Sequence, residues 1–169
     1  MGGTVKPGCV LFDWGDTLMV DFQDCTGPMA DWPHVEAVAH AHKALDDLRS
    51  RGWRLALATN AADSDEADIR AALSRVDLDG LLDHIYCSRR IGHRKPSREF
   101  FAFIESDLGM EASELVMVGD NHEVDVLGPN RVGIRAVWLC RDGRPVSGDS
   151  MQRTISDLEE LPELLESWL

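Results

Sequence analysis

Carboxylate and hydroxyl side chains stand at the ends of short apolar runs in this sequence, and a Lys-Pro pair, Lys95-Pro96, precedes an expected helix. Asp13 and Asp120 each come at the end of such a run, and Thr59 follows a third. Two carboxylates that are brought together repel each other, and a hard divalent cation such as Mg²⁺ relieves that repulsion. The Thr59 hydroxyl can donate to a phosphoryl oxygen, and the ammonium of Lys95 can offset charge on a transferring phosphoryl group. These residue types predict a site for phosphate and metal.

The apolar runs predict five buried strands, and helical patterns alternate with them. The expected strands cover residues 8–13, 53–58, 84–87, 115–118 and 135–139. The expected helices cover residues 35–50 (with Pro33 before them and Gly52 as a stop), 64–76, 97–108 (with Ser97 as N-cap), a stretch after Glu123, and 158–168. This alternation indicates an α/β fold, a three-layer Rossmann-like parallel sheet with helices on both faces. Such sheets bind ligands beyond the carboxyl ends of their strands, where the polar residues stand.

Length and charge narrow the function classes. The chain has 169 residues, which predicts a single domain over 1–169. Its formal net charge of −13 argues against nucleic acid and anionic membrane surfaces as partners. No apolar run approaches the roughly 20 residues of a membrane helix, and the N-terminal residues lack the apolar stretch of a secretory signal. We therefore expect a cytoplasmic protein.

The cysteines are Cys9, Cys25, Cys87 and Cys140. They are far apart and form neither a metal-binding pair nor the dense pattern of a disulfide scaffold. We expect them to be reduced, with Cys9, Cys87 and Cys140 in strands.

Four motifs follow one another in an order that is typical of one superfamily. They are FDWGDTL (12–18), ATN (58–60), RKP (94–96) and VGDNHEVD (118–125). In this order the sequence resembles the haloacid dehalogenase-like hydrolase superfamily over about residues 8–140. A response-regulator receiver domain uses similar residue types, but there the acidic pair comes first, so the order argues against it.

The resemblance implies a role for each matching residue. Asp13 would be the nucleophile that forms an aspartyl-phosphate, and Thr59, Asn60 and Lys95 would bind the phosphoryl group. The implied ligands of Mg²⁺ are Asp13, the backbone carbonyl of Gly15, Asp120 and Asp125, the last beside or behind the metal. Covalent catalysis by a carboxylate suits such a site, because each half of the reaction needs only in-line positioning and charge neutralisation.

Position 15 departs from the superfamily pattern. Phosphatases of that superfamily usually carry a second Asp two residues after the nucleophile. This Asp protonates the leaving group and then activates water. Gly15 cannot transfer a proton, and such help is typically worth about 10²–10⁴ in rate. Asp16 and His122 are the candidates to replace it. Two hypotheses stay open: a phosphatase or phosphotransferase of modest rate acting through Asp13, and a non-catalytic phosphate- or partner-binding module that keeps the metal site.

The spacing of the motifs leaves little room for a cap domain over the site. Between Asp13 and Thr59 only residues 19–33 are not used by the expected strands and helices. We therefore expect no cap or a minimal one, with this 19–33 segment as a short lid loop, or a second subunit covering an open site. The expected substrate is a phosphorylated small molecule or macromolecule.

Overall fold

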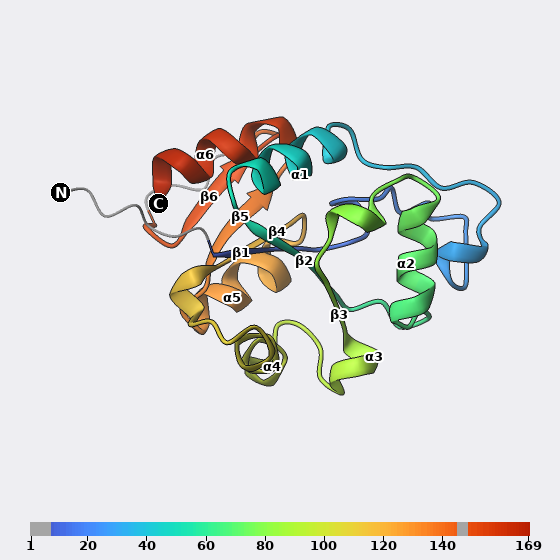
Figure 1. Ribbon diagram of the computed structural model, residues 1–169, viewed down its shortest axis with the longest axis horizontal. Coiled ribbons are helices and arrows are strands. Elements are labelled where there is room, and N and C mark those ends of the chain that lie inside the picture. Colours follow the sequence, from blue (N-terminus) through green and yellow to red (C-terminus); the bar gives the residue numbers. More distant parts are fainter. Residues whose placement is uncertain (1–7, 145–148) are drawn as a thin grey trace.

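The computed structural model describes residues 8–144 and 149–169. Its centre is a six-stranded sheet in the order β3-β2-β1-β4-β5-β6, in which every neighbouring pair is parallel. The strands are β1 (Cys9–Phe12), β2 (Arg54–Thr59), β3 (His84–Cys87), β4 (Leu115–Gly119), β5 (Arg135–Leu139) and β6 (Gln152–Ile155). The predicted α/β architecture is confirmed, because helices cover both faces of this sheet (Figure 1).

The helices alternate with the strands along the chain. They are α1 (Ala41–Ser50), α2 (Glu66–Ser74), α3 (Ser88–Ile91), α4 (Arg98–Leu108), α5 (Gly128–Arg131) and α6 (Leu161–Trp168). Short 3-10 turns lie at Met29–Asp31, Asp79–Leu81, Ala112–Glu114 and Leu158–Glu160, and a π-helical turn lies at His122–Leu127. None of the helices in the described ranges is long and apolar enough to cross a membrane.

Strand β6 corrects the predicted count of five. Its sequence, QRTI, contains one aliphatic residue and no apolar run, so the pattern does not reveal it. It forms the edge of the sheet through parallel pairing with β5, for example Val137 with Arg153. Such an edge strand depends on its partner more than on its own residue preferences.

The start of α1 is a second correction, because residues 35–40, which belong to the predicted helix, lie outside α1. Val38 N donates to the Leu18 carbonyl over 2.8 Å, so this stretch pairs with the chain that follows β1. The N-cap is His40, and Pro33 lies well before the helix. The apolar spacing that suggested a longer helix reflects packing of an extended ribbon.

The predicted N-cap of α4 and the predicted state and places of the cysteines can be compared directly with the structure. The Ser97 side chain accepts from Phe100 N over 3.3 Å and caps α4 as expected. All four cysteines are free thiols, with Cys9 and Cys87 in strands. Cys140 comes directly after β5 and is not part of a strand, which corrects its predicted place.

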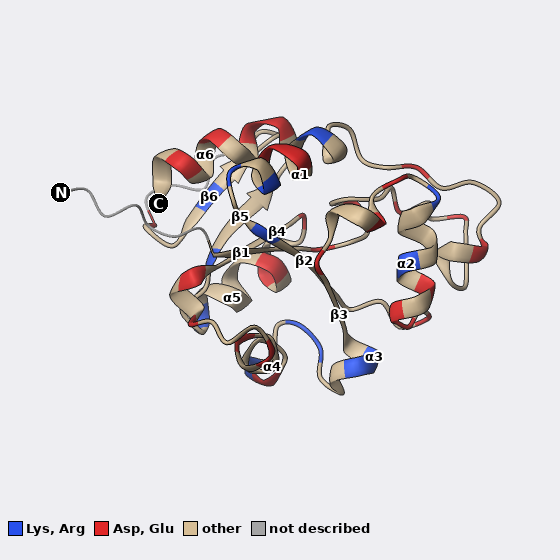
Figure 2. Ribbon diagram, viewed as in Figure 1, with Lys and Arg blue, Asp and Glu red and all other residues tan. Residues whose placement is uncertain are grey.

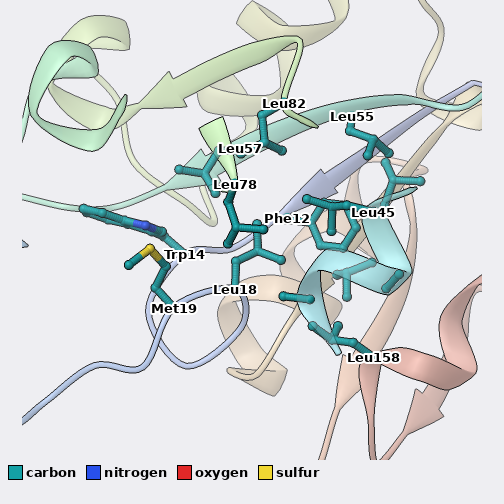
Figure 3. Close-up of a cluster of buried hydrophobic side chains, with 14 of the residues drawn as sticks. Phe12, Trp14, Leu18, Met19, Leu45, Leu55, Leu57, Leu78, Leu82 and Leu158 are labelled. Carbon is teal, nitrogen blue, oxygen red and sulfur yellow. The ribbon is translucent and has the colours of Figure 1, made fainter. Parts of the chain in front are cut away.

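Two apolar clusters fill the space on either side of the sheet. One gathers buried side chains of α1, α2 and α6, and the other gathers those of α4 and the π-helical turn. Figure 3 shows Trp14, Leu18 and Met19, from the turn after β1, in the same cluster as Phe12 and Leu57. All five are at most 4% exposed, so the core holds this turn in place. The turn carries the first predicted motif.

The 19–33 segment lies against α2, as the blue turn beside that helix in Figure 1 shows. The guanidinium of Arg75 donates to the carbonyls of Ala30 (3.1 Å) and Trp32 (2.7 Å). The Trp32 indole in turn donates to the carbonyl of Gly27 over 3.1 Å. Arg75, the residue directly after α2, therefore holds the C-terminal part of the 19–33 segment against this helix.

Replacing Arg75 with alanine removes these bonds and should loosen the 19–33 segment without unfolding the sheet. Chymotrypsin should then cleave the native protein at Phe22 and Trp32 at least about fivefold faster, the factor for about 1 kcal/mol of lost local stability. Arg98→Ala, at the exposed start of α4, is the matched control and should leave the rate unchanged. Equal cleavage of the two variants would show that Arg75 does not hold the segment.

Candidate active site at the strand ends

The carboxyl ends of three neighbouring strands bring the predicted residues together. Strands β2, β1 and β4 are adjacent in the sheet, and Thr59, Asp13 and Asp120 stand at or just beyond their ends. Asp13 N donates to the Val118 carbonyl over 2.9 Å, which extends the β1–β4 ladder by one residue. The sheet itself therefore sets the position of Asp13.

A buried lysine joins two of the carboxylates. Lys95 is 3% exposed, and its ammonium lies 3.0 Å from Asp13 Oδ1 and 2.7 Å from Asp125 Oδ1. Burial opposes the charge of Lys95, but the charges of Asp13 and Asp125 outweigh it and raise the pKa of the ammonium. Lys95 thus stays protonated and presents a positive charge to Asp13.

Asn60 holds the backbone of Lys95. Its side-chain nitrogen donates to the Lys95 carbonyl over 2.9 Å, and Lys95 N donates to its side-chain oxygen over 2.8 Å. The Asn60 side chain, predicted to bind phosphate, is therefore engaged with Lys95, although Asn60 also borders the cavity beside Asp13. In Figure 2 the stretch between α3 and α4, which carries Lys95, is coloured for positive residues.

Asp125 lies behind Asp13 and is 1% exposed. Its Oδ1 accepts from Lys95, and its Oδ2 accepts from Asn121 N over 3.2 Å. Gly119 allows this approach, because a Cβ there would lie only 2.3 Å from the Asp125 carboxyl carbon. With both oxygens engaged, Asp125 orients Lys95.

Oxygen atoms of Asp13, Asp120 and Asp125 all lie within 4.8 Å of one another. The hydroxyl of Thr17, which is fully buried, lies 3.3 Å from Asp13 Oδ2 and 3.4 Å from Asp120 Oδ1. Sequence reasoning gave Thr17 no role, although it belongs to the first motif. The sequence signal for Thr17 is a hydroxyl residue four positions after Asp13, directly before the apolar Leu18.

The charge of this cluster fits a divalent cation. Three carboxylates face the single ammonium of Lys95, and the side-chain donors of the cluster are oxygen atoms, which Mg²⁺ prefers. Burial and then the neighbouring Asp13 raise the pKa of Asp120 to about 7. Burial also raises the pKa of Asp125 to about 6, against the opposing effect of Lys95. A cation held by Asp13 and Asp120 would relieve this repulsion.

A tight turn follows Asp13 and contains Gly15. Asp16 N donates to the Met19 carbonyl (2.7 Å), and Met19 N donates to the Trp14 carbonyl (3.1 Å). These two bonds use the neighbours of Gly15 and not its own carbonyl, the predicted metal ligand. Asp16 adopts a φ of 57°, a left-handed conformation that Asp tolerates better than most residues.

The two candidates for the missing acid and base are occupied elsewhere. Asp16 Oδ1 accepts from Asp21 N over 3.0 Å, which ties the turn to the start of the 19–33 segment. His122 Nε2 lies 3.1 Å from Gln152 Oε1, and its ring packs on Trp138 with centroids 4.6 Å apart. Both side chains therefore have structural partners.

A cavity of about 350 Å³ opens beside Asp13. Thr59, which is 4% exposed, borders it, and the Thr59 hydroxyl accepts from Ala61 N over 3.1 Å. The 19–33 segment supplies the opposite wall through Asp21, Gly27, Met29 and Trp32. Burial, followed by the charges of Asp16 and Asp13, raises the pKa of Asp21. Asp21 is a cavity residue that the sequence analysis did not single out.

Comparison with known proteins agrees with this geometry. A family model described as haloacid dehalogenase-like hydrolase matches residues 16–139. The ribulose-1,5-bisphosphate 5-phosphatase of Halopiger xanaduensis is 34% identical over 123 residues, 73% of this chain and 50% of that protein. The phosphoserine phosphatase of Thermus thermophilus is 33% identical over 131 residues, 77% of this chain and 49% of that protein. The chain thus spans about half the length of these curated relatives.

A solved structure covers nearly the whole chain. The crystal structure of an uncharacterized protein from Listeria monocytogenes serotype 4b superposes with a TM-score of 0.84 at 29% identity. The match covers 95% of this chain and 98% of that one. A chain of about this size therefore occurs with the same arrangement elsewhere.

The raised pKa of Asp120 predicts how stability changes with pH when chelator removes metal. The folded-state pKa of about 7 exceeds the ordinary value of 3.8, so the folded state takes up a proton as pH falls through 7 while the unfolded state does not. This site therefore destabilises the fold above pH 7, and that cost declines as pH falls from 7 toward 4. Asp120→Asn, which still accepts from Thr17, should be more stable than the parent at pH 8.

The expected gain at pH 8 is on the order of 2 kcal/mol after screening by water, and it should fall to less than half of that at pH 5, since the cost is lost only between pH 7 and about pH 4. Urea unfolding at both pH values measures it. Asp46→Asn, on the exposed side of α1, is the control for a charge change alone. A gain for Asp120→Asn that is the same at both pH values would contradict the assignment.

Proposed function

Because the chain belongs to the haloacid dehalogenase-like hydrolase family, we propose that it is a Mg²⁺-dependent phosphatase or phosphotransferase that acts through an aspartyl-phosphate on Asp13. The observation that carries the proposal is the position of the Asp13 carboxylate. It borders the cavity and is also paired with a buried ammonium 3.0 Å away. The names of the two curated phosphatases above support the same reaction class.

The proposed reaction uses Asp13 as a covalent nucleophile. One carboxylate oxygen attacks phosphorus, the bond from phosphorus to the ester oxygen breaks, and the phosphoryl group remains on Asp13. Water then attacks phosphorus, which releases inorganic phosphate and restores the carboxylate; an alcohol in place of water gives phosphotransfer. The Thr59 hydroxyl and the Lys95 ammonium stabilise the phosphoryl oxygens on the side of the sheet.

Three further residues position this machinery. Asp125 and Asn60 hold the two ends of Lys95, its ammonium and its backbone. The Thr17 hydroxyl lies between Asp13 and Asp120 and fixes their separation. Asp13, Asp120 and the Gly15 carbonyl would hold Mg²⁺, which supplies positive charge to the phosphoryl oxygens when bound.

A phosphate- or partner-binding module is the alternative function, and Gly15 is the observation that favours it. A glycine cannot donate a proton to the leaving group, so the residues could bind a phosphate ester and turn it over slowly or not at all. Turnover of an activated aryl phosphate separates the two functions, because a binding module shows binding without product.

The partners follow from the same site. We propose a phosphorylated small molecule or macromolecule as substrate, since the cavity is open toward solvent and bordered by one short segment instead of a domain. A second copy of the chain covering the site, and a cytoplasmic location, belong to this proposal. Nucleic acid and membranes are not proposed as partners, because the net charge is −13.

Replacing Asp13 with asparagine should abolish hydrolysis of 4-nitrophenyl phosphate, with a loss of at least about a thousandfold, because the amide cannot attack phosphorus. Release of nitrophenolate in Mg²⁺ buffer measures the rate, and chelator should cause a comparable loss in the parent. Asp46→Asn should retain the parent rate. Undiminished turnover in Asp13→Asn would rule out the covalent mechanism.

Binding of Mg²⁺ should also stabilise the fold through linkage to the native state. At ten times its dissociation constant the ion contributes about 1.4 kcal/mol, which raises Tm by about 3–5 °C in a protein of this size. Asp120→Asn should lose most of this gain, and sodium chloride of equal ionic strength should not reproduce it. A parent protein whose Tm ignores millimolar Mg²⁺ would argue against a cation site.

A further inference from the structure

The space beside Gly15, where the superfamily's second aspartate would project, is bordered by another carboxyl group. A Cβ placed on Gly15 would lie 3.3 Å from Asp21 Cβ and 3.4 Å from Asp21 Oδ2. Asp21 is six positions further along the chain, and its carboxyl group lies next to the place that a side chain at position 15 would occupy. Position 15 lacks an acid, but this part of the cavity does not.

Asp21 faces the same cavity as Asp13, and its backbone is fixed there. Asp21 N donates to Asp16 Oδ1 over 3.0 Å, and the preceding residue, Val20, donates to the Glu36 carbonyl over 2.9 Å. The first bond joins Asp21 to the turn after Asp13, and the second joins Val20 to the stretch before α1. The backbone that carries the Asp21 side chain is therefore held beside the cavity by two different segments.

We propose that Asp21 is the residue that transfers protons to the leaving group and from water in this active site. The inference rests on the proposed function and extends it to the position that Gly15 leaves vacant. Asp16 then acts as a positioning residue, since its carboxylate holds Asp21 N.

The proton balance is as follows. While Asp13 attacks phosphorus and the phosphorus–oxygen bond to the leaving group breaks, the Asp21 carboxylic acid gives its proton to that oxygen, and the alcohol departs. The Asp21 carboxylate then takes a proton from the water that attacks the aspartyl-phosphate. Inorganic phosphate leaves, Asp13 is again a carboxylate, and Asp21 is again an acid.

The first experiment compares two esters in Mg²⁺ buffer. Glycerol phosphate has a poor leaving group that needs a proton, whereas 4-nitrophenolate leaves without one. Asp21→Asn should hydrolyse glycerol phosphate about 10²–10⁴-fold more slowly than the parent. With 4-nitrophenyl phosphate it should release one nitrophenolate per active site in a rapid burst and then turn over slowly, because the aspartyl-phosphate still forms but water is no longer activated.

The matched control is Asp24→Asn, an exposed aspartate of the same segment that does not border the cavity. It should behave as the parent does with both esters. Asp63→Asn tests the other cavity aspartate, which follows β2. Loss of glycerol phosphate hydrolysis in Asp63→Asn with full activity in Asp21→Asn would overturn the inference.

The second experiment moves the carboxyl group back to position 15. Gly15 has no left-handed φ, so its backbone accepts an aspartate, but Gly15→Asp alone would set two carboxylates side by side and should give no gain. The double variant Gly15→Asp/Asp21→Asn removes that conflict and should recover at least about tenfold of the rate that Asp21→Asn loses. If the double variant is no faster than Asp21→Asn, then an aspartate at position 15 does not replace the Asp21 carboxyl, and the proposed role of Asp21 is contradicted.

Failure of the proposed function and failure of the role of Asp21 give different results. If the parent shows no turnover that depends on Asp13, the proposed function fails and the role of Asp21 fails with it. If the turnover depends on Asp13 and is unchanged in Asp21→Asn, only the role of Asp21 is wrong.

Discussion

The ammonium of Lys95, buried between the carboxylates of Asp13 and Asp125, is the interaction around which the strand-end site is arranged. A buried charge is tolerable only when its partners are close and fully bonded, since loss of one partner leaves another charge unpaired. The surrounding features meet this demand. Asn60 fixes the Lys95 backbone, and Gly119 leaves room for Asp125 to come close.

The same interaction leaves the site negatively charged. One ammonium faces three carboxylates, and the raised pKa values of Asp120 and Asp125 reflect this excess together with burial. A protein that needed only stability would gain from fewer acids here. The retained excess is consistent with a site that binds a divalent cation, because such a cation takes carboxylate oxygens as ligands and its charge would then offset that of a phosphoryl group.

The wall opposite the strand ends consists of the 19–33 segment. Arg75 ties its far end to α2, and Asp16 ties its near end to the turn after β1. The cavity is thus bordered by a segment that is part of the core domain, and the buried Trp32 of this segment is one of the residues that line it. In the proposed reaction this wall supplies a reacting group, Asp21, as well as shape, so the wall and the chemistry depend on each other.

The sequence by itself determined strands β1 to β5 and the residues at the ends of β1, β2 and β4. Buried parallel strands appear in the sequence as local apolar runs, so Asp13, Thr59 and Asp120 could be placed at one edge of the sheet. The N-cap serine, Ser97, likewise predicted the start of α4. Contacts between distant segments decided the rest. Strand β6 exists because β5 is its partner, and the stretch before α1 is not helical because Glu36 and Val38 pair with the chain after β1. Asp21 comes beside Gly15 only because the chain reverses at Asp16 and is then held by that stretch, and no local pattern encodes a pairing of that kind.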